Sequence, residues 1–346
     1  MGKVHLLAAA SVDNGRLRYR KPFVFAALKS QSKAEISERM SQIRAGAGGD
    51  DTALEKGLMK LLQGVPHVIQ LYEVWHDTEN VHTVMEYLQD DVIGLLNRIG
   101  VLEEATAQRV FVHTCLGLKA LHDARFCHRD LSPENVMVTT DVRSQPLAKV
   151  IDFGMAARLP DDDKCLPGLR IPFGKMSYLS PEYFGKMPYD GRKNDIWALG
   201  CTLFTLTERK MLFEQPSLAD PRFALLHANR HQELFNLSRS TNHNWHILPE
   251  SDRRPPMSQA LADLLAGLLQ VNPDYRVASV DDILAHPWVS EHVAIARAEW
   301  EADNPDRAAA AAAAAAAGPP GGPAAGAAAA AAGGAGGRSP GDAPPS

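Results

Sequence analysis

Short apolar runs separated by polar turns dominate the first ninety residues of the chain. Residues 3–8, 23–29 and 81–88 are apolar and strand-like, and a turn containing Asp13-Asn14-Gly15 separates the first two runs. Between the second and third runs, four leucines follow the spacing of one helical face: Leu54, Leu58, Leu61 and Leu62. The pattern therefore predicts strands with one amphipathic helix among them.

Helical periodicity is more prominent in the part of the sequence that comes next. Residues 103–126 predict one long amphipathic helix, whose buried face carries Val110, Phe111, Cys115, Leu118 and Leu121. Two short strands are predicted over residues 136–138 and 148–151, and a last surface helix over residues 290–303. The two parts of the chain thus carry different hydrophobic patterns.

Length and charge narrow the classes of partner. The chain has 346 residues, enough for a large domain or two lobes with buried cores, and a formal net charge of −5. Such a charge gives no reason to expect nucleic acid or an anionic membrane as a partner. The four cysteines are widely spaced without a C-x-x-C pair, which favours reduced and mostly buried thiols.

The sequence also bears on location and on the C-terminal end. It has no run of 18 apolar residues, and residues 1–6 lack the pattern of a signal peptide or a myristoylation site. We therefore expect a soluble intracellular protein, cytoplasmic or alternatively nuclear. Residues 304–346 are rich in alanine, glycine and proline, a composition that cannot bury a core, so a disordered tail is predicted there.

The candidate chemistry lies in two polar motifs. Asp130 precedes Asn135 by five residues in a polar loop after the long helix, and Asp152 ends a strand-like run about twenty residues later. A carboxylate that accepts a hydroxyl proton, with an amide and a second carboxylate that hold Mg²⁺, is what phosphoryl transfer from ATP requires. The motifs therefore predict Asp130 as the proton acceptor and Asn135 and Asp152 as metal ligands.

These motifs resemble those of a known family. Residues 128–135 and Asp152-Phe153-Gly154 resemble the H-R-D-x-x-x-x-N loop and the D-F-G motif of eukaryotic protein kinases, with calmodulin-kinase-like features near the end. The resemblance implies an α+β, bilobal kinase domain over residues 2–290. A small antiparallel sheet with one main helix would form an incomplete lobe over residues 2–88, and a mainly helical lobe would span residues 89–290. It implies ATP and Mg²⁺ as cofactors and proteins as substrates.

The resemblance also assigns residues to the nucleotide phosphates. Ala27-Leu28-Lys29 resembles the end of the family's V-A-I-K strand, so Ala27 would line the site and Lys29, held by Glu55, would contact the α and β phosphates. Gly2 and Val4 fall where the last glycine and the valine of the glycine-rich loop belong. We expect the sequence to begin downstream of that loop's first two glycines. The alternatives are a protein with half of this phosphate cover, or a Gly2 without a role.

Residues 81–88 resemble the hinge that holds adenine between the two lobes. The resemblance implies that Met85 is the gatekeeper, that backbone groups of Glu86 and Leu88 bond adenine, and that Met137 forms the floor beneath it. Asp91 is a candidate contact of the ribose, and an exposed turn carboxylate is an equal alternative.

Two positions depart from the family's usual residues. Ser132 stands where the Ser/Thr-type loop has a lysine that reaches the γ-phosphate, and Lys175 stands where the family has a threonine that bonds the catalytic acid. We hypothesise that the two have exchanged roles, so that Lys175 neutralises the γ-phosphate and Ser132 bonds Asp130. The alternative is independent drift in a weakened enzyme.

Residues 155–173 correspond to the family's activation segment and contain no Ser, Thr or Tyr, so phosphorylation within the segment cannot order it. Arg129, which binds a phosphate in many members of the family, has the acidic residues 161–163 as a candidate substitute; a solvated acidic turn is the alternative. We predict activity without an activating kinase, given a complete N-terminal lobe.

Several structural expectations accompany the resemblance. Glu182 should pair with Arg276 in a buried ion pair, and Asp195 should brace the catalytic loop. Residues 66–72 are expected to form the strand after the helix that carries Glu55. The glycine-rich residues 45–49 are expected to form a flexible insertion.

Together these features predict a Ser/Thr protein kinase. The alternative is a pseudokinase that binds partners without transferring phosphate, which the missing first half of the glycine-rich loop favours. Four residues argue against the alternative, because a protein without transfer activity has no chemical need for all of them: Lys29, Asp130, Asn135 and Asp152.

Overall fold

The computed structural model describes residues 3–8, 10–13, 16–19, 25–44, 51–141, 143–161, 165–168, 173–240 and 257–303. The chain divides into two units, residues 1–299 and 300–346, and the first unit contains all of the described strands. Gly2, the glycine-rich residues 45–49 and the predicted tail over 304–346 lie outside the described residues, so the expectations about them stay predictions.

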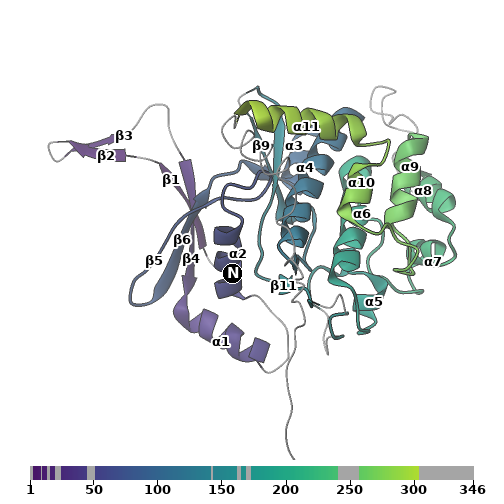
Figure 1. Ribbon diagram of the computed structural model, residues 1–346, viewed down its shortest axis with the longest axis horizontal. Coiled ribbons are helices and arrows are strands. Elements are labelled where there is room, and N and C mark those ends of the chain that lie inside the picture. The colour runs from purple at the N-terminus through teal and green to yellow at the C-terminus, as the bar shows by residue number, and fades with distance from the viewer. Residues whose placement is uncertain are drawn as a thin grey trace, which may run out of the picture. The chain divides into compact units, whose positions relative to one another are not determined.

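The first part of the chain forms a four-stranded antiparallel sheet (Figure 1). Its order is β1 (Lys3–Ala8), β4 (Phe25–Ser32), β6 (Asn80–Glu86) and β5 (Leu71–His76), which confirms strands in all three predicted runs. A separate hairpin of β2 (Ala10–Asp13) and β3 (Arg16–Tyr19) lies between β1 and β4 in the chain. In the sheet, Lys29 pairs with Thr83 and Ala27 with Met85, so these side chains share one face.

Helix α2 (Thr52–Leu61) confirms the predicted amphipathic helix, but Leu61, which the leucine spacing placed on its apolar face, is exposed. The Asp51 carboxylate caps its first turn by accepting hydrogen bonds from the amides of Ala53 and Leu54. The helix buries one face, and that face positions Glu55 toward the sheet; it consists of Thr52, Glu55, Leu58 and Met59.

Helix α1 (Lys33–Arg44) is an element that the sequence analysis did not predict. Its apolar residues Ile36, Met40 and Ile43 recur at intervals of four and three, a helical spacing that could have revealed it. The glycine-rich residues 45–49 that follow favour a flexible insertion over a helix.

The prediction of a strand over residues 66–72 was wrong about where the strand begins. Strand β5 begins at Leu71, because the residues before it pair with a distant strand, β10 (Pro146–Val150). The Val150 amide donates to the His67 carbonyl, and the Ile69 amide donates to the Val150 carbonyl. Val68 is fully buried in this contact. The stretch thus joins the first part of the chain to the second.

The remainder is mainly helical, as predicted. Helices α4 (Glu104–Asp123) and α6 (Gly191–Glu208) bury most of their residues in the same apolar core as α9 (Gln259–Leu268). The predicted face of α4, including Val110 and Leu118, lies in that core. The other helices described in this part of the chain are α3 (Val92–Ile99), α5 (Pro181–Phe184), α7 (Pro221–His227), α8 (His231–Ser240), α10 (Val280–Leu284) and α11 (Ser290–Asp303).

A small three-stranded sheet and a strand pair flank the loop that carries Asp130. β9 (Val136–Thr140) pairs with β10, and β7 (Asp90–Asp91) adds to β9; β8 (Phe126–Cys127) pairs with β11 (Ala157–Arg158). The short turns η1 (Pro133–Asn135) and η2 (Met176–Tyr178) follow Ser132 and Lys175. These pairings hold the loop between two fixed ends.

The expected buried ion pair is present. Arg276 donates to Glu182 at 2.7 Å, and the Arg276 side chain is fully buried beneath the Trp197 ring.

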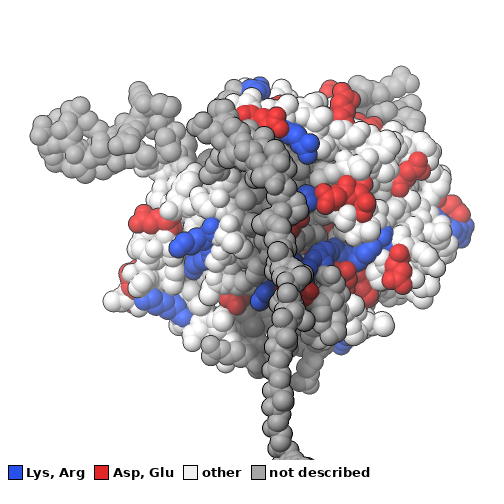
Figure 2. All heavy atoms as spheres, viewed as in Figure 1, with Lys and Arg blue, Asp and Glu red and all other residues white. Residues whose placement is uncertain are grey.

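Among the helices of the described residues, none combines the length and the apolar composition needed to span a membrane. On the face shown in Figure 2, Lys and Arg side chains are interspersed with Asp and Glu.

Candidate active site

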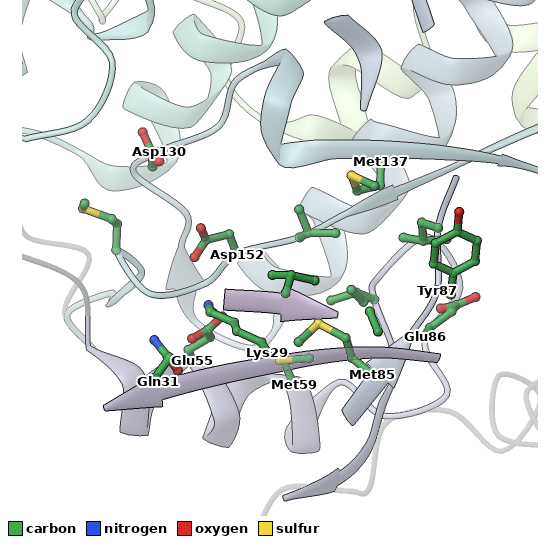
Figure 3. A pocket seen from close by; sticks show the side chains of 16 residues that line it. Lys29, Gln31, Glu55, Met59, Met85, Glu86, Tyr87, Asp130, Met137 and Asp152 are labelled. Atoms are coloured by element: carbon green, nitrogen blue, oxygen red, sulfur yellow. The ribbon is translucent and has the colours of Figure 1, made fainter. Parts of the chain in front are cut away.

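A cavity of about 720 Å³ lies against the sheet, α2 and the strands of the helical region (Figure 3). Most of the residues predicted to bind nucleotide line it: Val4, Ala27, Lys29, Glu55, Met85, Glu86, Leu88, Asp130, Met137 and Asp152. Sequence reasoning did not assign six further lining residues to the site: Gln31, Met59, Ile69, Tyr87, Ile151 and Met155. The structure thus brings together residues that the sequence separates by more than a hundred positions.

Lys29 and Glu55 form the predicted ion pair, with 2.7 Å between Lys29 Nζ and Glu55 Oε1. Strand alternation turns Lys29 toward the cavity, and the cap of α2 fixes Glu55 on the facing side. The Glu55 side chain is 6% exposed and that of Lys29 19%, so water screens the pair little. The arrangement presents one fixed ammonium to the cavity.

Asp130 is held by backbone and side-chain contacts of its own loop. Asn135 Nδ2 donates to the Asp130 carbonyl at 2.7 Å and to Asp130 Oδ2 at 2.9 Å. Burial raises the pKa of the Asp130 carboxyl above its usual range, and the charge of Lys175 offsets part of that rise. The site therefore combines an oriented carboxylate with increased basicity.

Asp195 braces this loop from α6, as predicted. Its buried carboxylate accepts hydrogen bonds from the amides of His128 at 2.7 Å and Arg129 at 2.9 Å, and it contacts His122 Nε2 at 2.9 Å. Arg129 has a φ of 65°, an uncommon left-handed backbone that such bonds stabilise. The loop geometry therefore depends on α6.

Asp152 faces the cavity at the start of the D-F-G motif. Its φ is 62°, and Oδ1 accepts a hydrogen bond from the Gly154 amide at 3.3 Å. Phe153 is fully buried against the His128 ring, with 5.6 Å between ring centroids. The turn thus directs the Asp152 carboxylate into the cavity, and the buried Phe153 ring fixes the turn in place.

The donor set fits a magnesium ion bound together with phosphate. Asn135 Nδ2 is directed at Asp130, so Oδ1 is the atom with which Asn135 would hold a metal ion together with the Asp152 carboxylate. Asp152 lines the cavity, whereas Asn135 is not among the cavity residues. Mg²⁺ usually takes one or two protein oxygens and fills the remaining positions with phosphate and water. Among the residues described, no three His, Cys, Asp or Glu side chains form a complete protein-only metal site.

Ser132 and Lys175 meet, although in an arrangement different from the hypothesis. Lys175 Nζ donates to Ser132 Oγ at 2.7 Å and pairs with Glu134 at 3.0 Å. The hydrogen bonds of the described residues do not include one from Ser132 to Asp130. Lys175 therefore bridges two residues of the catalytic loop.

Glu86, predicted to contact adenine, and Asp91, predicted to contact the ribose, both have partners within the protein. The Glu86 amide donates to the Gln70 carbonyl at 2.9 Å, and the Glu86 carboxylate pairs with Lys149 at 2.7 Å. The Glu86 amide is therefore already occupied. Asp91 is not among the cavity residues; its carboxylate caps α3 by accepting a hydrogen bond from the Gly94 amide at 2.7 Å. Gly2 lies outside the described residues.

The comparison of the sequence with known families agrees with this geometry. The sequence model described as "Protein kinase domain" matches residues 18–289. The chain belongs to the protein kinase family. The kinase fold explains why the sheet, α2 and the helical region meet at the cavity, and membership of this family supports ATP binding and phosphotransfer as its general chemistry.

The chain is similar in sequence to kinases from a yeast, a plant and human. The chain is 29% identical over 277 residues to the "Probable serine/threonine-protein kinase KCC4" of Saccharomyces cerevisiae, and these cover 78% of the chain and 24% of that kinase. It is 32% identical over 235 residues to "CBL-interacting protein kinase 4" of Oryza sativa subsp. japonica, covering 66% of the chain and 46% of the relative. Human "Serine/threonine-protein kinase ULK3" is 29% identical over 272 residues, which cover 77% and 48%. The chain thus spans less than half the length of these relatives.

Proposed function

We propose that the chain is a Ser/Thr protein kinase that transfers the γ-phosphate of ATP to hydroxyl groups of protein substrates. The observation that carries this proposal is the 2.7 Å ion pair of Lys29 and Glu55 on the same cavity as Asp130 and Asp152. Phosphoryl transfer needs positioned cations for the phosphates and a base for the hydroxyl, and this cavity combines both. Serine/threonine kinases among the relatives support the choice of acceptor.

Asp130 is the proposed proton acceptor. Its hydrogen bonds with Asn135 orient the carboxylate, and burial makes it more basic than an exposed aspartate. In the proposed reaction the substrate hydroxyl oxygen attacks the γ-phosphorus, its proton passes to Asp130, and the bond to the β,γ-bridging oxygen breaks to release ADP.

Asn135 and Asp152 are the proposed ligands of Mg²⁺, which neutralises charge on the phosphates when it is bound. Lys29 is the proposed contact of the α and β phosphates, and Glu55 holds its ammonium in place. Lys175 lies beside the loop of Asp130, where it can neutralise charge at the γ-phosphate end.

Adenine is proposed to lie at the hinge end of the cavity. Apolar side chains of Val4, Ala27, Met85 and Met137 line this cavity and suit the faces of a planar base. Because the Glu86 amide bonds Gln70, we assign the Glu86 carbonyl and the Leu88 amide to adenine.

The proposal is tested by the chemical identity of the product. The chain is incubated with γ-labelled ATP, Mg²⁺ and a generic protein substrate, and the labelled residues are identified after acid hydrolysis. Label on serine or threonine is expected. Label confined to tyrosine contradicts the proposed acceptor. With folded protein, nucleotide bound but no label, the pseudokinase alternative replaces the proposal.

A further inference from the structure

Gln31 is a buried polar residue at the nucleotide cavity that has no role in the proposed transfer chemistry. It lies two positions after Lys29 on β4, so strand alternation places both side chains on the same face. Gln31 is 3% exposed, the one fully buried residue of β4, and its side chain lines the cavity with Glu55 and Met59.

Packing alone does not explain a glutamine at this position. Its Oε1 atom is buried without a hydrogen-bond partner, which destabilises a fold compared with an apolar side chain of the same size. Five buried side-chain atoms in the described part of the chain share this property: Gln31 Oε1, Thr52 Oγ1, Thr83 Oγ1, Trp197 Nε1 and Thr202 Oγ1. Of these residues only Gln31 lines the cavity. Because Oε1 is buried and unpaired, the part of the carboxamide left available to a ligand is its other end, the Nε2 donor.

The position and chemistry of the amide indicate the kind of ligand. Figure 3 shows Gln31 beside Lys29 and Glu55, at the end of the cavity away from Glu86 and Tyr87, with its amide nitrogen turned toward the cavity. A carboxamide offers N–H donors without charge. A second cation there would compete with Lys29 for Glu55, whereas a neutral donor leaves that ion pair intact.

We propose that Gln31 binds the phosphate chain of the nucleotide, with its amide N–H groups donating to phosphate oxygens next to Lys29. The inference rests on the proposed function, because it needs a nucleotide with adenine at the hinge. Gln31 then accounts for part of the preference for ATP over adenosine, while its unpaired Oε1 remains a cost to stability that a functional residue can carry.

The test compares ATP with adenosine in binding titrations of Gln31→Met, which replaces the amide by an apolar side chain of similar size. We expect ATP to bind about 10-fold more weakly, about 1.4 kcal/mol, and adenosine affinity to change less than about 2-fold. The midpoint of thermal unfolding without nucleotide should rise, because the unpaired Oε1 is removed. Thr202→Val, on α6 and not among the cavity residues, is the matched control: it also removes an unpaired buried atom and should leave both affinities unchanged.

A second variant keeps the inference testable if Gln31→Met does not fold. Gln31→Glu adds negative charge beside the phosphates and should weaken ATP much more than adenosine. An unchanged ratio of ATP to adenosine affinity in either folded variant overturns the inference and leaves the proposed function intact. A wild-type chain that binds neither ligand overturns the proposed function, and this inference with it.

Discussion

The ammonium of Lys175 donates a hydrogen bond to the hydroxyl of Ser132 at 2.7 Å, across 43 positions of sequence. The family's usual residues at these two positions are a threonine and a lysine, so a cation and a hydroxyl still face each other with their places exchanged. Lys175 also pairs with Glu134 and lies close enough to Asp130 to influence its pKa. One side chain, two residues after the activation segment, thus contacts both Ser132 and Glu134 of the catalytic loop.

The double exchange Ser132→Lys with Lys175→Thr should retain kcat/KM within about 3-fold of wild type, while each single variant should lose about 10-fold or more. Lys175→Thr removes the only cation of this pair, and Ser132→Lys places two cations side by side. Steady-state transfer assays on the four proteins measure the coupling. If both single variants are as active as wild type, the two positions are not coupled.

The acid limb of the pH–rate profile should move when Lys175 is neutralised. The base acts when deprotonated, so activity falls as the pH drops through the pKa of Asp130, which burial raises above its usual value. Lys175 lowers that pKa, and its removal raises it further. Lys175→Met should therefore shift the acid limb of kcat/KM to higher pH, while Lys175→Arg should leave it in place. A limb that moves to lower pH contradicts this assignment.

Activity should not require phosphorylation of the activation segment. Arg129 donates to the carbonyls of Met155 at 2.6 Å and Ala156 at 3.1 Å, and it lies 4.7 Å from the Phe173 ring centroid. Of the acidic residues 161–163 predicted as a substitute for the phosphate, Asp161 contacts Arg158 instead, and residues 162 and 163 lie outside the described residues. Neutral groups of the segment thus hold Arg129.

Phosphatase-treated protein should keep its turnover within about 2-fold of untreated protein, since no phosphate is needed to engage Arg129. Phe173→Leu should reduce turnover about 5-fold by removing the cation–π contact, and limited proteolysis of residues 155–158 should become faster. Complete loss of turnover after phosphatase treatment would falsify this account of the segment.

Breaking the Glu182–Arg276 pair should destabilise the fold. Glu182→Ala leaves the buried Arg276 guanidinium without its carboxylate, an effect of about 3–5 kcal/mol. The free energy of unfolding in urea measures it. The exposed pair of Arg230 and Glu233 supplies the control, because Glu233→Ala should change stability little. Equal effects of the two substitutions would show that burial is not what matters.

Local patterns predicted the elements that carry the site. The leucine spacing located α2 and its Glu55, and the run ending at Lys29 located β4. The motifs also correctly predicted that Asp130 and Asp152 belong to the site, and both line the cavity. Each follows closely after a strand, β8 or β10, which fixes its position. Such features depend on contacts between residues close in sequence.

Features that depend on distant contacts were missed or placed differently. The start of β5 is set by residues 67–69 pairing with Val150, about eighty positions away. Ser132 contacts Lys175 and not Asp130, and the two residues in contact lie 43 positions apart in the sequence. The importance of Gln31 depends on its burial, although its spacing of two from Lys29 is a signal that could have been used.

The most direct test of the central claim is the transfer of phosphate from ATP to protein by wild type and by Asp130→Asn, with Asp123→Asn as a matched control at the exposed end of α4. Circular dichroism and ATP binding establish that all three proteins fold and bind nucleotide. The account predicts Mg²⁺-dependent transfer by wild type and Asp123→Asn, and a loss of about 10²–10⁴-fold in Asp130→Asn. Transfer that survives unchanged in Asp130→Asn would contradict it.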